Sequence, residues 1–324
     1  MDFASLIMSA VISALCVLIS GPFLIPELHK LKFGQSIREE GPKSHQAKSG
    51  TPTMGGLMLI AAITLASLIA CGNDARVALA LFVTLGHGAI GFLDDYIKVV
   101  KKRNLGLRPR QKLLGQIAMA IVVTFIGTEF LGMTTELWIP FLNTVIDLKF
   151  FYYVLVFFVL VGTTNAVNLT DGLDGLAAGT VAAASAAYAF VCIHFGMAEL
   201  SAFCVAVAAA SLAFLRFNAH PARVFMGDTG SLALGGAIAA AAILTKTELL
   251  LVIIGGVFVI EALSVIIQVI SFQTTGKRVF LMSPIHHHFE LSGWKETKVV
   301  RAFWAAGIML ALIGIGILKI NFGK

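Results

Sequence analysis

Charged residues are scarce in this 324-residue chain. Lys, Arg, Asp and Glu make up 13% of it and hydrophobic residues 58%, whereas soluble domains average about 25% charged residues. The mean hydropathy is +0.89. A soluble globular protein is therefore excluded, and an integral membrane protein is predicted.

Other features are missing as well. The four cysteines are scattered in or beside apolar stretches without a Cys-x-x-Cys pair, so we interpret them as small hydrophobic residues. Basic residues are not interleaved with aromatic ones, so no nucleic-acid-binding module is predicted. The opening Met-Asp-Phe lacks a basic region, which argues against a cleaved signal peptide. Because no linker-like tract divides the apolar blocks, we expect a single integral membrane domain over residues 1–324.

Long apolar runs dominate what is present. A membrane-spanning helix needs about 20 apolar residues, with a lower limit near 17. The runs predict an all-α polytopic membrane protein with about ten transmembrane helices. They cover residues 3–25, 53–72, 77–93, 113–128, 150–170, 175–198, 200–215, 229–245, 249–276 and 302–318.

Lys and Arg are distributed asymmetrically between the two sides of these spans. With the N- and C-termini outside, the inner loops carry 19 of the 24 basic residues. Cytoplasmic loops are enriched in Lys and Arg, so this orientation is predicted, with the active site on the cytoplasmic face. The inner loops are 26–52, 94–112, 163–175, 216–230 and 272–301.

Five acidic residues lie in three polar breaks that this orientation places on the inner face. The first break carries Asp94 and Asp95 at a helix end, followed by Lys98; a solvated helix end with an intrahelical ion pair is the alternative interpretation. The second carries Asp171 and Asp174, each followed by Gly, as in a tight loop whose backbone approaches a ligand. A capped helix connector would not require this acidic, amide-rich composition, so we favour a functional loop.

The third break, 225–231, places Asp228 among small residues and hydroxyls at a helix start. Free N–H groups there would bind an anion, but Asp228 would repel a bare phosphate, which implies a cation between them. Phe225 is interpreted as a stacking platform for a nucleobase or as an interfacial aromatic residue.

A fourth polar segment contains His286, His287 and His288 in a row, followed by Phe289 and Glu290. Consecutive side chains diverge, and neither Cys nor a zinc-type His spacing accompanies them, so hydrogen bonds to phosphate or sugar oxygens fit better than zinc. Most inner basic residues are interpreted as positive-inside charges. Lys48 and Lys112 are the exceptions, because they lie close to apolar spans where they could reach a ligand.

Together these motifs resemble the bacterial phospho-N-acetylmuramoyl-pentapeptide transferases. The first three motifs are similar to those of the wider polyprenyl-phosphate sugar-1-phosphate transferase family, and the triple-His segment points to the muramoyl-pentapeptide branch. The motifs are Asp94-Asp95-x-x-Lys98, Asn165-x-x-Asn168-x-x-Asp171-Gly172-x-Asp174-Gly175, Gly227-Asp228-Thr229-Gly230-Ser231 and Pro284-Ile285-His286-His287-His288-Phe289-Glu290.

The resemblance implies a Mg²⁺-dependent transfer of phospho-N-acetylmuramoyl-pentapeptide from a UDP-linked donor to undecaprenyl phosphate. The products are lipid I and UMP, the pathway is peptidoglycan synthesis, and the implied setting is the bacterial inner membrane, with a homodimer and no nucleic acid. Because the acceptor phosphate, with a second pKa of about 6, is already largely dianionic, direct attack on the sugar-linked phosphorus is favoured over an aspartyl-phosphate intermediate.

The resemblance also implies roles for individual residues. The implied catalytic residues are Asp94, Asp95, Asp228, His287 and His288. Asp228 would be the first Mg²⁺ ligand, with Asp171 as a second, and Asp94 and Asp95 would orient the metal or the acceptor phosphate. The substrate contacts divide into a nucleoside side and a phosphate side, with Thr53 and His286 also among the substrate-binding residues. The nucleoside side comprises Asn168, Asp171, Asp174 and Phe225, and the phosphate side comprises Lys48, Lys112, His287 and His288.

Two alternatives remain at this point. A sister enzyme that uses UDP-N-acetylglucosamine would carry the same first three motifs. A transporter is the alternative from another class, because buried ionisable residues mark ion pathways. Glu261 is the acidic residue within a predicted span, whereas the five acidic residues of the polar breaks gather at one face, which favours the enzyme.

Overall fold

The computed structural model describes residues 3–30, 50–100 and 106–322 of the chain. Over these residues the chain is mostly helical, and the prediction of an all-α polytopic protein with about ten spans is confirmed. Nine helices are long and apolar enough to cross a membrane, and α2 is a shorter apolar helix. The helices are α1 (Phe3–Lys30), α2 (Gly56–Ala70), α3 (Ala75–Val100), α4 (Pro109–Leu131), α5 (Phe150–Thr170), α6 (Leu176–His194), α7 (Ala198–Asn218), α8 (Gly227–Leu244), α9 (Glu248–Ile254), α10 (Gly256–Thr275), α11 (Ile285–Leu291) and α12 (Glu296–Phe322).

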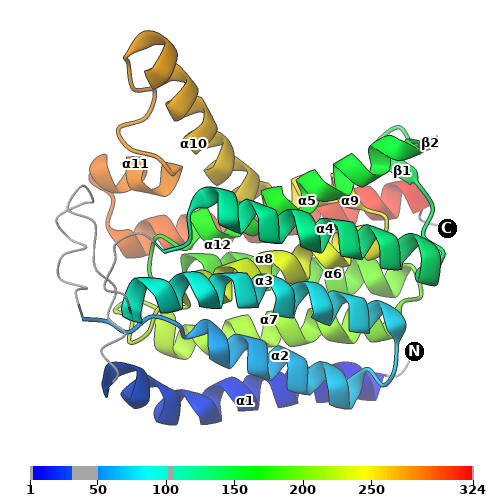
Figure 1. Cartoon of the computed structure of the whole chain (residues 1–324), viewed down its shortest axis with the longest axis horizontal. Coiled ribbons are helices and arrows are strands. Elements are labelled where there is room, and N and C mark those ends of the chain that lie inside the picture. The colour runs from blue at the N-terminus through cyan, green and yellow to red at the C-terminus, as the bar shows by residue number, and fades with distance from the viewer. Residues whose placement is uncertain (1–2, 31–49, 101–105, 323–324) are drawn as a thin grey trace.

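Helix α8 lies at the centre of the bundle (Figure 1). Every residue from Thr229 to Leu244 is buried, and most of them are Gly, Ala or Ser. Small residues allow helix backbones to approach closely inside a membrane, where association depends on packing because lipid is as apolar as the core. The peripheral helices instead expose large apolar side chains, such as Phe23 of α1 and Phe130 of α4, as lipid-facing surfaces require.

The bundle has two chemically different ends. The N- and C-termini lie at one end together with strands β1 (Glu136–Ile139) and β2 (Thr144–Asp147), and we call this the hairpin end (Figure 1). We call the opposite end, which carries Asp94, Asp171 and Asp228, the acidic end. The three polar breaks meet there through direct contacts described below, so the prediction that they share one face is confirmed.

The β1–β2 hairpin departs from the all-α expectation. Its register pairs Leu137 with Ile146. Trp138 is buried and its ring centroid lies 4.9 Å from that of Phe322 at the end of α12. The sequence predicts no strand here, because the alternation of this segment is too short to distinguish a strand from an interfacial loop.

The ninth apolar run is broken by Gly255 into α9 and α10. Helix α10 leaves the bundle at a steep angle (Figure 1), and its buried residues end at Ser264. The return segment is tied back to α10 by Gln268, whose Oε1 accepts the backbone N–H groups of Val279 and Phe280, each at 2.9 Å. The short helix α11 therefore returns to the acidic end beside α10.

The predicted orientation can be tested with two single cysteines. The background is Cys16→Ala, because the other three native cysteines are buried. In this background, we expect Ser292→Cys at the acidic end to react with an impermeant maleimide from the cytoplasm only. Thr144→Cys in the hairpin should react from outside only, because both side chains are exposed and the basic loops are retained inside. Labelling of both positions from the same side, or in the reverse pattern, would contradict the orientation.

Candidate active site

Helices α3 and α8 approach each other most closely at the acidic end. A Cβ atom on Gly91 would lie 2.1 Å from the carbonyl oxygen of Asp228, so only glycine fits there. Gly227 has φ +70°, and a Cβ atom on it would lie 2.4 Å from Asp95 Oδ2. The two glycines therefore allow the carboxylates of α3 to lie directly beside the first turn of α8.

Asp95 caps the N-terminus of α8 from the neighbouring helix. Its Oδ1 accepts the N–H of Asp228 at 3.2 Å, and its Oδ2 accepts both the N–H and the hydroxyl of Thr229 at 2.9 and 2.7 Å. These N–H groups have no partner inside the helix, and a carboxylate there also faces the positive end of the helix dipole. The side chain of Asp95 is buried, so it holds the two helices in register.

Asp94 and Asp228 share two lysines. Lys98 Nζ lies 2.5 Å from Asp94 Oδ2 and 3.3 Å from Asp228 Oδ2. Lys112 Nζ lies 3.1 Å from Asp94 Oδ1 and also pairs with Asp228 Oδ2. The intrahelical pair of Asp94 with Lys98 was anticipated as the alternative to a site; here it is one part of a network that joins α3, α4 and α8.

Polar side chains of α5 complete this network. Asn168 Nδ2 donates to Asp228 Oδ1 at 3.0 Å and to Ser231 Oγ at 2.8 Å. One level deeper, Gln116 of α4 is buried and donates to Thr164 Oγ1 at 2.9 Å. The two layers position α4 and α5 against the start of α8, which brings Lys112 and Asn168 to the same carboxylate.

The arrangement offers a cluster of hard oxygen ligands. One carboxylate oxygen each from Asp94, Asp95 and Asp228 lies within 4.8 Å of the others. Asp171 is not a member of this group, but it lies close enough for the charges of Asp95 and Asp228 to affect its pKa. Burial raises the pKa of the Asp171 carboxyl well above its usual value, and the negative charges of Asp228, Asp95 and Asp174 raise it further. Excess negative potential of this kind favours a cation.

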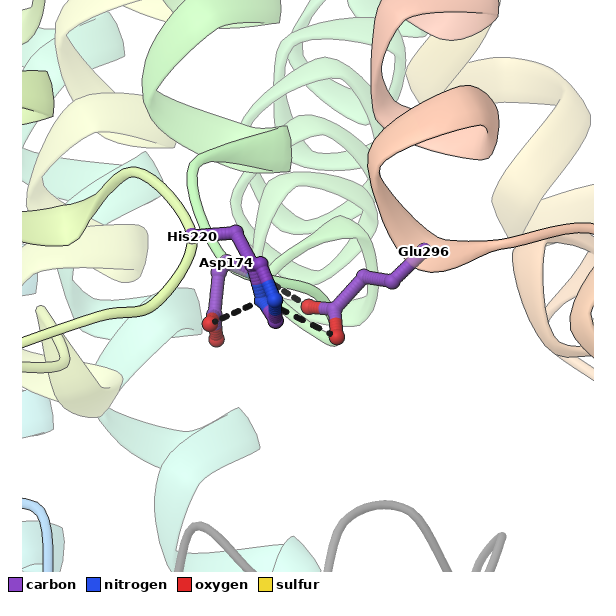
Figure 2. Close-up of side chains that lie close together, drawn as sticks. All are labelled: Asp174, His220 and Glu296. Atoms are coloured by element: carbon purple, nitrogen blue, oxygen red, sulfur yellow. Dashed lines mark hydrogen bonds and ion pairs between the residues drawn. The ribbon is translucent and has the colours of Figure 1, made fainter.

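A second group that includes acidic residues consists of Asp174, His220 and Glu296 (Figure 2). The ring of His220 stands between two carboxylates, with Nδ1 3.1 Å from Asp174 Oδ2 and 3.5 Å from Glu296 Oε2. Asp174 N donates to Glu296 Oε1, and Asn218 Oδ1 accepts the N–H of Gly175. The structure thus separates Asp174 from the first group and fixes its loop to α7 and α12.

The triple-His segment begins helix α11. The rings of His286 and His287 lie together, with centroids 4.1 Å apart, instead of diverging as expected. His286 is fully buried and its Nδ1 lies 3.0 Å from Glu261 Oε1. His287 Nδ1 lies 2.9 Å from Glu290 Oε2. The N–H of Leu281 points to His288 Nδ1 at 3.2 Å. The three rings therefore have separate partners and form no shared metal site among the described residues.

The remaining predicted residues are placed as follows. Phe225 is half-buried, and its backbone pairs with the segment 52–55 through Phe225 N to Pro52 O and Gly55 N to Phe225 O, each at 2.8 Å. Thr53 is buried, and its Oγ1 would lie 2.6 Å from a Cβ atom on Gly227. Lys48 lies outside the described residues.

Some residues of these networks were not selected from the sequence. Lys98 was noted only as an ion-pair partner, although its spacing of four from Asp94 was a usable signal. Gln116, one turn beyond Lys112, also gave a usable signal, because an isolated amide side chain in an apolar span needs a hydrogen-bond partner. His220 and Glu296 belong to separate segments, so no local spacing could have joined them to Asp174.

Known proteins resemble this chain over nearly its full length. Residues 77–246 match the family model for glycosyl transferase family 4. A protein of Geobacillus sp. (strain WCH70) named phospho-N-acetylmuramoyl-pentapeptide-transferase is 60% identical over 96% of this chain and 97% of its own length. A protein of the same name from Bacillus subtilis (strain 168) is 60% identical over 91% of this chain and 92% of its own length. The chain therefore belongs to the phospho-N-acetylmuramoyl-pentapeptide transferase family, within glycosyl transferase family 4.

Proposed function

We propose that this chain, as a multi-pass protein of the bacterial inner membrane, transfers phospho-N-acetylmuramoyl-pentapeptide from its UDP-linked donor to undecaprenyl phosphate. The products are UMP and lipid I, an intermediate of peptidoglycan synthesis. The proposal depends on the likeness to the Geobacillus protein named phospho-N-acetylmuramoyl-pentapeptide-transferase, whose sequence is 60% identical over 96% of this chain. This likeness supports the transferase over a transporter. The buried Glu261, which suggested the transporter alternative, is paired with His286.

The geometry of the acidic end suits two substrates of different solubility. The carboxylates and lysines lie where membrane-spanning helices α3 and α8 end or begin, so a water-soluble nucleotide can approach them from the aqueous side. A lipid phosphate would reach the same level from the bilayer. One polar end at the membrane surface is what a transfer from a soluble donor to a lipid requires.

The donor set of the acidic group fits Mg²⁺. Three carboxylates with ligand atoms within 4.8 Å provide hard oxygens, and Mg²⁺ is bound by one or two carboxylates together with substrate phosphates and water. We propose Asp228 as the first ligand and Asp171 as a further one. When bound, the ion would neutralise charge on the donor pyrophosphate. Asp94 and Asp95 orient this site, Asp95 through its bonds to α8.

The lysines and the loop residues are proposed to hold the donor. The ammonium groups of Lys112 and Lys98 lie beside Asp228. In this position they could also bind phosphate oxygens of the donor. The predicted phosphate or sugar contacts remain His287, His288 and Lys48. Thr53 and His286 remain predicted substrate contacts without a more specific role. The predicted nucleoside side consists of Asn168, Asp171, Asp174 and Phe225.

Direct attack by the acceptor phosphate is the proposed reaction. An oxygen of undecaprenyl phosphate bonds to the sugar-linked phosphorus, the bond to the UMP oxygen breaks, and UMP leaves with the electron pair. The acceptor, with a pKa of about 6, is mostly dianionic at neutral pH and needs no strong base. Both oxygens of Asp95 already accept hydrogen bonds from α8, which makes this carboxylate a poor nucleophile.

Purified protein in detergent should release UMP only when UDP-N-acetylmuramoyl-pentapeptide, a polyprenyl phosphate and Mg²⁺ are all present. UDP-N-acetylglucosamine should replace the donor poorly, since the motifs and the relatives favour the muramoyl branch. Omission of each component, and the two donors side by side, provide the controls. Equal turnover of UDP-N-acetylglucosamine would favour the sister enzyme, and UMP release without lipid would contradict the proposal.

The resemblance also implies a homodimer in the membrane. We expect the detergent-extracted protein to show twice the mass of one chain by native mass spectrometry. A monomer at concentrations where the transferase is fully active would contradict this.

A further inference from the structure

Glu261 is a carboxylate within a membrane-spanning helix that the proposed reaction does not use. It lies on α10 and is fully buried. Such a residue is costly inside a membrane and is retained where a partner and a function require it. Its partner is His286 of α11, whose Nδ1 lies 3.0 Å from Glu261 Oε1. An ionised carboxylate only accepts, so with Glu261 ionised the Nδ1 atom would carry the proton of this bond.

The far side of the His286 ring faces the Asp171–Asp174 loop. A Cβ atom on Gly172 would lie 2.3 Å from His286 Nε2, so the ring occupies the space that any side chain at position 172 would need. Neither His286 Nε2 nor Glu261 Oε2 has a hydrogen-bond partner among the described residues. The buried ring thus presents a polar atom to the backbone between two predicted donor-binding carboxylates.

Two kinds of contact hold α11 in place. Phe289 packs against the buried cluster of Leu173, Leu176, Val299 and Val300, and the bond from His286 to Glu261 is the buried polar contact beside it. The helix has seven residues, and His286 is its buried one. Helix α10 has no buried residue after Ser264, so Glu261 is near the last point at which α10 is still held by the bundle. The Glu261–His286 bond therefore connects the firmly packed part of α10 to the segment that carries His287 and His288.

We propose that Glu261 is a positioning residue that acts through His286 to hold α11 against the Asp171–Asp174 loop, completing the binding site of the UDP-linked donor. The proposal rests on the function proposed above. It predicts an effect on the donor and not on the lipid acceptor, because α11 and the loop carry predicted donor contacts.

The first test is Glu261→Leu in the full-length protein. Loss of one buried, charge-assisted hydrogen bond should raise the KM for UDP-N-acetylmuramoyl-pentapeptide by about 10- to 100-fold. The KM for polyprenyl phosphate should stay within about twofold. Glu261→Gln keeps an oxygen that accepts from Nδ1–H, so its donor KM should rise less than about fivefold. Calorimetric titration of the donor without lipid measures the dissociation constant of the donor directly. It should rank the wild-type protein, Glu261→Gln and Glu261→Leu in the same order, independently of turnover.

A double-mutant cycle distinguishes positioning through His286 from general damage. In a His286→Phe background the ring stays but the bond is already lost, so Glu261→Leu should change the donor KM by less than about twofold. Replacing both partners with apolar groups also removes the buried Nδ1–H group that Glu261→Leu alone leaves without an acceptor, so this double variant should fold even if Glu261→Leu alone does not.

Glu248 offers a matched control at the hairpin end. It is also a buried glutamate, and it accepts a hydrogen bond from the Tyr152 hydroxyl at 2.6 Å. Glu248→Leu should lower the melting temperature without changing the donor KM. An unchanged donor KM in folded Glu261→Leu, multiplicative effects in the cycle, or an equal KM change in Glu248→Leu would each overturn the inference. Absence of transfer by the wild-type protein would instead contradict the proposed function.

Discussion

Asp228→Asn should abolish turnover while leaving the protein folded. Asp228 is the carboxylate on which Lys98, Lys112 and Asn168 all converge. The amide keeps the shape of the side chain but loses the negative charge proposed to hold Mg²⁺. Loss of metal stabilisation of the transferred phosphate should lower kcat by about a thousandfold or more.

The measurement is initial UMP release at saturating donor, lipid and Mg²⁺. Asp147→Asn is the matched control, because Asp147 is an exposed carboxylate on the hairpin, far from the acidic end. Both variants should elute like the wild-type protein and remain folded at the assay temperature. If folded Asp228→Asn retained near-wild-type turnover, the assignment of Asp228 as the metal ligand would fail.

Asp95→Asn should have the second largest effect, for a different reason. The carboxylate accepts hydrogen bonds from Asp228 N, Thr229 N and the Thr229 hydroxyl. An amide would turn an NH₂ group toward one of these donors and leave a buried N–H without a partner. The first turn of α8 would shift and move Asp228 with it, so we expect kcat to fall by about a hundredfold and the melting temperature to drop.

Thr229→Val is the graded control for this prediction. It removes only the hydroxyl bond and keeps both backbone bonds to Asp95, so turnover should fall less than about tenfold.

The stereochemical course at the sugar-linked phosphorus should be inversion for the wild-type protein. Wild-type turnover by Asp95→Asn would contradict the capping role, and net retention, or a phospho-enzyme trapped on Asp94 or Asp95, would contradict direct attack.

The helical spans could be read from the sequence because a membrane imposes one strong requirement. Each span must be long, apolar and internally hydrogen-bonded, so ten runs predicted nine long helices and α2. The hairpin at residues 136–147 was missed because four-residue strands carry little periodicity. The break at Gly255 was missed because an isolated glycine in an apolar run is also compatible with a continuous helix.

The acidic end was predictable in composition but not in its contacts. Loop placement brought Asp94, Asp171 and Asp228 to one face, and the structure brings the networks of Asp94 and Asp228 together through Lys98 and Lys112. That Asp95 caps α8, or that His220 joins Asp174 to Glu296, depends on packing between segments far apart in the chain. No local pattern encodes such distances.

The pairing of His286 with Glu261 shows the same limit. The triple-His motif predicted three similar ligand contacts, whereas one of its rings is fully buried against α10. Three consecutive positions on a short helix point in different directions, but the sequence does not say which one faces inward. The substrate contacts of His287 and His288 stay predictions.

A single-turnover experiment tests the central claim, that the acidic end joins two substrates in one direct transfer. Enzyme in excess over donor labelled in both the uridine and the sugar is mixed with Mg²⁺, with and without polyprenyl phosphate, and quenched in time. With the lipid, labelled UMP and lipid-linked sugar phosphate should form at the same rate and in equal amounts; without it, no UMP should form. A burst of UMP without lipid, or UMP formed faster than the lipid-linked product, would contradict the account.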